Sequence, residues 1–170
     1  MIGRKPYIRY FIFLITVFIC LTNCKGKETQ TETPKLPKKA GGLRLVKTVQ
    51  GVMANKFMYQ MHGKVIGTHT SIIGYYGNND KENVLYVSSF ENHENAEKAL
   101  IRMASKINNN SAGFTPTAAD QTNKGVVYRT NGMGLKHFFY RSGKFLVWWQ
   151  TNSGKAEVSF QDLYTFKFGE

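Results

Sequence analysis

The apolar positions between Val46 and Met61 recur at steps of three and four, which is the spacing of one buried face of a helix. Polar residues fill the positions between them, and His62-Gly63 supplies an end signal. Gly51 lowers the helix propensity by about 1 kcal/mol relative to alanine, but the periodicity outweighs this cost. We therefore predict an amphipathic helix here. Its core-facing positions are Val46, Val49, Val52, Met53, Phe57 and Met61.

Two runs rich in β-forming residues follow, at 70–76 and 83–90, with a cluster of turn residues between them. This order is typical of a β-hairpin. In the second run both alternating faces begin with apolar residues, so we expect this strand to lie inside the sheet and not at its edge.

The clearest helical pattern covers residues 93–108, where apolar residues form one stripe and charged residues occupy the opposite face. Asn92 precedes this segment as the predicted N-cap. Glu94 and Lys98 stand in the favourable i,i+4 order for an ion pair. We predict a surface helix whose apolar stripe packs on the sheet.

The remaining pattern predicts a polar loop at 111–124 and then three strands, at 125–130, 135–140 and 144–151. Short glycine-containing turns separate these strands. The last segment, 156–168, fits a helix, with a strand as the alternative interpretation.

The predicted order is helix, hairpin, helix, three-stranded meander and helix, which indicates an α+β domain. Short turns between consecutive strands permit only antiparallel pairing. We expect an antiparallel sheet of about five strands with two or three helices packed on one face. Because the order helix-strand-strand occurs twice, a ferredoxin-like or pseudo-duplicated arrangement is one form that this fold could take.

The first 24 residues follow a different pattern. Three positive charges within the first nine residues precede an uncharged apolar run of 12 residues, 10–21. A membrane-spanning helix needs roughly 20 such residues. The run ends in Leu21-Thr22-Asn23-Cys24, which resembles the cleavage motif of a bacterial lipoprotein signal peptide. This resemblance implies a lipid on the Cys24 thiol and cleavage before that residue.

The resemblance also implies a domain organisation. Residues 1–23 would be the signal peptide, 24–42 a lipidated cysteine with a flexible basic tether, and 43–170 a single α+β domain. The tether is rich in Lys, Thr, Glu, Pro and Gly, a composition that cannot bury a core. Because Lys25 and not Asp follows the cysteine, an outer-membrane location is expected in preference to the inner membrane if the organism has two membranes.

The cysteine content and the net charge limit the kinds of reactive site and of binding partner that the chain can have. Cys24 would be the only cysteine of the mature chain, so disulfides, thiol nucleophiles and zinc–thiolate sites are excluded. The formal net charge of +12 falls to +9 when the three positive charges of the signal are removed. For an exported protein, anionic lipid, a glycan or an acidic envelope protein is a better partner than nucleic acid.

Residues with catalytic or metal-binding potential are few. No two of the four histidines have the spacing of metal ligands on one helical face, and no hydrolase or nucleotide-binding motif occurs. We therefore predict a protein without enzymatic activity and without a cofactor. Met58, Met61 and His62 could bind a soft metal such as Cu(I), although core packing explains most of that pattern. His137 is either a pocket residue or an ordinary sheet histidine.

Neighbouring aromatic residues supply a candidate binding surface. Tyr75-Tyr76, 138–140 and Trp148-Trp149 each place adjacent rings on opposite faces of a strand. If helices cover one face, the rings on the open face could bind a partner or form a homodimer; the alternative is that both faces are buried. The candidate partner-binding residues are Tyr75, His137, Phe138, Tyr140 and Trp148.

These observations favour a lipid-anchored protein of the bacterial cell envelope whose single domain binds a partner without catalysing a reaction. A carrier of a soft metal or a small apolar ligand is the alternative. An enzyme whose site carries no recognisable motif is the third possibility.

Overall fold

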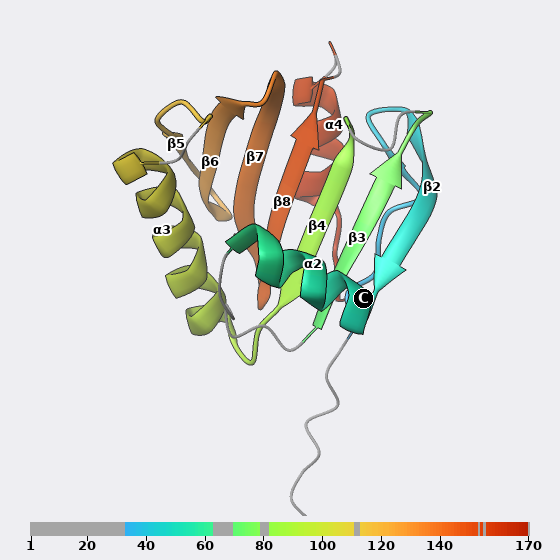
Figure 1. The fold of residues 1–170 in the computed structure, drawn as a ribbon, viewed down its shortest axis with the longest axis horizontal. Coiled ribbons are helices and arrows are strands. Elements are labelled where there is room, and N and C mark those ends of the chain that lie inside the picture. Colours follow the sequence, from blue (N-terminus) through green and yellow to red (C-terminus); the bar gives the residue numbers. More distant parts are fainter. Residues whose placement is uncertain are drawn as a thin grey trace, which may run out of the picture. The chain divides into compact units, whose positions relative to one another are not determined.

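A computed structural model of the chain describes residues 33–62, 70–78, 82–110, 113–152, 154 and 156–169. The described residues belong to one compact unit, Thr31–Glu170, and contain one antiparallel sheet and three helices (Figure 1). None of these helices is long and apolar enough to cross a membrane. The predicted lipoprotein motif and Cys24 lie outside the described residues.

The described sheet has eight strands where the sequence predicts about five, and their order is β1-β2-β3-β4-β8-β7-β6-β5. All neighbouring strands are antiparallel. No ferredoxin-like arrangement is confirmed. The strands are β1 (Lys39–Ala40), β2 (Leu43–Gln50), β3 (Thr70–Tyr76), β4 (Val84–Ser89), β5 (Ala118–Thr122), β6 (Gly125–Gly132), β7 (Leu135–Ser142) and β8 (Phe145–Thr151).

The elements with the clearest patterns are confirmed. β4 lies between β3 and β8, and all six of its residues are buried, as expected for an interior strand. Helix α3 (His93–Asn110) begins after Asn92, whose Oδ1 accepts a hydrogen bond from Asn95 N–H at 2.9 Å. Lys98 Nζ lies 2.7 Å from Glu94 Oε1. The last helix is α4 (Ala156–Thr165).

The single helix predicted from residue 46 is wrong, because strand β2 precedes helix α2 (Val52–His62). Gly51 separates them with a φ of +66°, a conformation that costs glycine little. β2 pairs with β3, and this pairing satisfies the backbone groups that a helix would have satisfied internally. Pairing with a distant strand therefore overrides the helical periodicity.

The polar loop predicted at 111–124 is also wrong in part, because it contains strand β5. This strand pairs with β6 at the edge of the sheet, and four of its five residues are exposed. An exposed edge strand has no buried face, so its sequence, Ala-Ala-Asp-Gln-Thr, shows no apolar alternation.

Helices cover both faces of the sheet, and not one face as predicted. Figure 1 shows α2 in front of the sheet and α4 behind it, and α3 packs on the face opposite α4, against Phe139 and Leu146. Successive side chains of β7 and β8 point to opposite faces, and both sets are apolar, so each face requires a cover. The α4 face buries Phe138, Tyr140, Val147 and Trp149; α3 covers Phe139 and Leu146; α2 covers Ile73, Val84 and Tyr86.

Part of the predicted tether belongs to the packed unit. Lys35 N–H donates to the Phe168 carbonyl at 2.9 Å, and the Tyr76 hydroxyl donates to the Pro37 carbonyl at 2.9 Å. Ala40 is fully buried. Residues 35–40, which the predicted boundary at 43 leaves in the tether, therefore pack on the domain.

Candidate functional site

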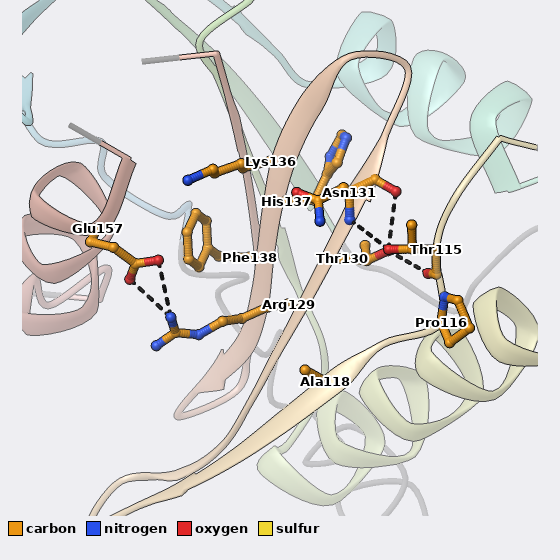
Figure 2. A pocket seen from close by; sticks show the side chains of 10 residues that line it. All are labelled: Thr115, Pro116, Ala118, Arg129, Thr130, Asn131, Lys136, His137, Phe138 and Glu157. Atoms are coloured by element: carbon orange, nitrogen blue, oxygen red, sulfur yellow. Dashed lines mark hydrogen bonds and ion pairs between the residues drawn. The ribbon is translucent and has the colours of Figure 1, made fainter. Parts of the chain in front are cut away.

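A cleft of about 260 Å³ opens between the β6–β7 hairpin, the start of β5 and the start of α4 (Figure 2). Two of the predicted site residues, His137 and Phe138, line it. Its other lining residues are Thr115, Pro116, Ala118, Arg129, Thr130, Asn131, Lys136 and Glu157.

Arg129 dominates the charge of the cleft. Its Nη1 lies 3.0 Å from both carboxylate oxygens of Glu157, and its Nε lies 2.6 Å from Asp120 Oδ2. The guanidinium also lies over the rings of Phe138 and Phe160, at 5.5 and 5.7 Å from their centroids. Two carboxylates therefore already pair with the Arg129 guanidinium. Lys136 is the other basic side chain that lines the cleft.

The opposite wall is a set of hydrogen bonds between the segment before β5 and strand β6. The Thr130 hydroxyl donates to the Thr115 carbonyl at 2.6 Å, and Asn131 N–H donates to Thr115 Oγ1 at 3.1 Å. Thr115 N–H donates in turn to the Asn131 carbonyl at 2.8 Å. These polar groups satisfy one another, so the wall is built to hold the segment in place.

His137 is a structural residue with both ring nitrogens occupied. The indole N–H of Trp148 can only donate, so at 3.0 Å it makes His137 Nδ1 an acceptor. The other nitrogen, Nε2, therefore carries the proton and donates to the Gly132 carbonyl at 3.0 Å. Because the side chain is engaged at both ends, it is not available as a general base for a substrate in the cleft.

Burial lowers the pKa of His137 below its ordinary value, and the hydrogen bond to Gly132 opposes this shift in part. The unfolded chain takes up the proton near pH 6.5, whereas the folded protein takes it up only at lower pH. The unfolded state therefore binds more protons in this window, so stability falls as the pH falls below about 6.5. We expect the urea midpoint to decrease between pH 7.5 and 5.5.

Two variants test this assignment. His137→Gln should reduce the dependence of the urea midpoint on pH in this range. His93→Gln removes an exposed histidine at the start of α3 and should leave the dependence unchanged. An unchanged dependence in His137→Gln would show that another group causes it.

The other predicted partner-binding residues do not form an open platform. Phe138 and Tyr140 are 2% and 1% exposed on the face that α4 covers. Trp148 lies on the opposite face, partly buried between α2 and α3, and Tyr75 is partly buried beside α2. Each face of the sheet carries at least one helix, so these aromatic side chains do not gather on an open face.

The candidate soft-metal ligands also separate. Met58 is 4% exposed and packs against the sheet, whereas Met61 is 43% exposed. The side chain of His62 lies outside the described part of the chain. In that part no group of three or more His, Cys, Asp and Glu side chains is placed to bind a metal. Met58 belongs to the core, so its thioether is not free to coordinate an ion.

Sequence reasoning missed the most exposed apolar surface among the described residues, the outer face of α2. The buried positions of this helix are Ala54 and Met58, whereas the four predicted core-facing residues that it contains, Val52, Met53, Phe57 and Met61, are exposed. Among the exposed ones, Val52 and Met53 are 83% and 67% exposed. We call the following exposed residues the α2 face: Val52, Met53, Lys56, Phe57, Tyr59, Gln60 and Met61.

The spacing of Ala54 and Met58 by four residues was the signal for this orientation. Two small or flexible apolar residues are a weak signal beside the four larger ones of the predicted stripe that lie in this helix, so the periodicity favoured the wrong face. Phe57 keeps partial contact with the sheet through a stacked arrangement on Tyr86, with ring centroids 6.2 Å apart.

Comparisons with family models, with curated proteins and with solved structures give no match for this chain.

Proposed function

We propose that this chain is a lipid-anchored protein of the bacterial cell envelope, whose domain binds another envelope component without catalysing a reaction. The α2 face takes the place of the open sheet face as the binding surface. The observation that carries this proposal is that five of the seven exposed residues of α2 are apolar or aromatic. A contiguous exposed apolar surface marks an interaction site more often than it marks an ordinary surface.

The cleft supports the alternative of a small-ligand carrier less well. Its volume of about 260 Å³ is below the roughly 300–1,000 Å³ of common ligand sites. Polar and charged groups line most of it, which disfavours an apolar ligand, and its arginine is already paired. The third possibility, an enzyme, loses His137 as a base because that ring is held by two structural hydrogen bonds.

One experiment in intact cells tests the anchor and the surface together. We expect a photoreactive side chain at Tyr59 of the full chain to crosslink to a component of the membrane fraction. Fatty-acid labelling should accompany this product, because the mature chain would be acylated on Cys24. Cys24→Ala should abolish the label, and Cys20→Ala should keep it because Cys20 would leave with the signal peptide.

The matched control for the surface is a photoreactive side chain at Val158. This residue is 56% exposed on α4, which covers the other face of the sheet, and it should give no such product. Label that persists in Cys24→Ala would contradict the anchor. Equal crosslinking from Tyr59 and Val158 would contradict the binding surface.

A further inference from the structure

We propose that the α2 face lies against the anionic surface of the membrane to which the protein is anchored. This proposal rests on the proposed function, because it assumes the lipid on Cys24, and it names the component that the α2 face contacts. It is carried by the composition of the face, its geometry and the short distance between the anchor and the domain.

Strand β2 and helix α2 together are basic. Residues 43–62 contain three basic residues, Arg44, Lys47 and Lys56, and no acidic residue. A surface helix that combines an apolar face with basic residues is typical of segments that lie in the interface of an anionic membrane. Tyr59 adds an aromatic ring with a polar end, a side chain that suits the headgroup region.

The geometry of α2 allows a side-on contact. The helix has 11 residues and is therefore about 16 Å long. It lies across the front of the sheet in Figure 1, held by the buried side chains of Ala54 and Met58. Val52, Met53, Lys56, Tyr59 and Gln60 therefore lie on the side of the helix that faces away from Ala54 and Met58, and Phe57 lies at its border, stacked on Tyr86. Lys56 lies among its apolar residues and can extend its amine to the headgroups.

The short connection to the anchor keeps the domain near the bilayer. Cys24 and Thr33 are nine residues apart in the sequence, so the chain between them spans at most about 30 Å. Residues 33–42, assigned to the tether by their composition, pack on the domain and add nothing to this reach. The domain therefore stays within about 30 Å of the headgroups, a distance at which the exposed apolar residues and Lys56 of α2 can reach them.

Charge argues against a second copy of the chain as the occupant. A two-fold dimer through this face would bring Lys56 of both copies together, with no acidic residue between 43 and 62 to pair with it. Anionic headgroups supply the missing negative charge. Binding of an acidic protein is the competing outcome, and the experiment below separates the two.

The test uses the full lipidated chain, purified from membranes and reconstituted into vesicles of phosphatidylethanolamine and phosphatidylglycerol. The mature chain would have no free cysteine, so Met53→Cys and Val158→Cys each provide a single site for a polarity-sensitive fluorophore. We expect lipids brominated on the acyl chains to quench the label at 53 at least about twofold more than the label at 158. Vesicles of phosphatidylcholine alone, or high salt, should reduce this difference.

A second substitution tests the role of charge. Lys56→Glu in the Met53→Cys background should weaken the quenching, whereas Lys136→Glu, which changes the net charge equally but lies in the cleft, should not. Equal quenching at 53 and 158 in protein that stays on the vesicles would overturn the membrane contact and leave the anchor intact. Protein that does not stay on the vesicles would instead contradict the anchor. A photoreactive residue at 53 that captures a protein and no lipid in native membranes would assign the α2 face to a protein partner.

Discussion

Trp149→Ala is expected to lower the free energy of unfolding by about 3–5 kcal/mol, as in other large-to-small substitutions of buried aromatic residues. Trp149 is fully buried in β8, where its ring meets the edge of Tyr76 at a centroid distance of 5.6 Å. Its indole N–H donates to the Ser159 hydroxyl of α4 at 3.2 Å. The substitution would leave a cavity between the sheet and α4 and would remove this bond.

Urea unfolding followed by far-ultraviolet circular dichroism measures this loss without using tryptophan fluorescence, which the substitution itself changes. Trp149→Phe is the control, because it keeps a ring in the core and removes the hydrogen bond. It should cost about 1–2 kcal/mol, since a lost hydrogen bond costs about 1 kcal/mol and the Ser159 hydroxyl still donates to the Ala156 carbonyl. Equal losses in both variants would show that the hydrogen bond, and not the packing of the ring, holds α4 to the sheet.

Gly41→Ala is the second substitution with a large expected effect, a loss of about 2–5 kcal/mol. The backbone of Gly41 has a φ of +59°, a left-handed conformation that costs other residues about 1–2 kcal/mol. A Cβ at this position would lie 2.4 Å from the Cβ of Ser159 and 2.8 Å from its Cα. Relieving such an overlap costs a further 1–3 kcal/mol or so, because a helix backbone has to move.

Gly42→Ala separates the two contributions. Gly42 also has a positive φ, +82°, but a Cβ there would meet no atom within 4 Å. It should therefore cost only about 1–2 kcal/mol, the backbone term alone. Thermal unfolding of both variants gives the difference between their losses of unfolding free energy. This difference measures the energetic effect of the close approach of the N-terminal segment to α4. Equal losses would mean that this close approach contributes nothing to stability.

A hydrogen bond also joins the turn between β1 and β2 to α4, because Gly41 N–H donates to Asp162 Oδ2 at 2.7 Å.

Several elements could be predicted because their signals are local. The α3 helix has an N-cap at Asn92, an i,i+4 ion pair and an apolar stripe within one segment. The hairpins of β6, β7 and β8 have short glycine-containing turns, which allow only antiparallel neighbours. In these segments the residues that decide the structure are close together in the sequence.

The candidate site was predicted only in part. His137 and Phe138 line the cleft, but Arg129 and Glu157, which supply its main ion pair, are 28 residues apart and show no joint signal. The α2 face was missed because its large apolar residues have the same spacing as a buried stripe. Only contact with the sheet shows which side of a helix is buried.

The sequence by itself determined the class of the fold, the position of α3 and the strands of the C-terminal meander, because hydrophobic periodicity, caps and turns act over a few residues. It also carries the lipoprotein-like motif at Cys24, which stays a prediction. The tertiary structure alone decided that residues 43–50 join β3 as a strand, that both faces of the sheet are covered, and that residues 33–42 pack on the domain. These outcomes depend on contacts between residues far apart in the sequence. Whether one segment is buried depends on the segment that packs against it, and the hydrophobic pattern of the first segment carries no information about the second.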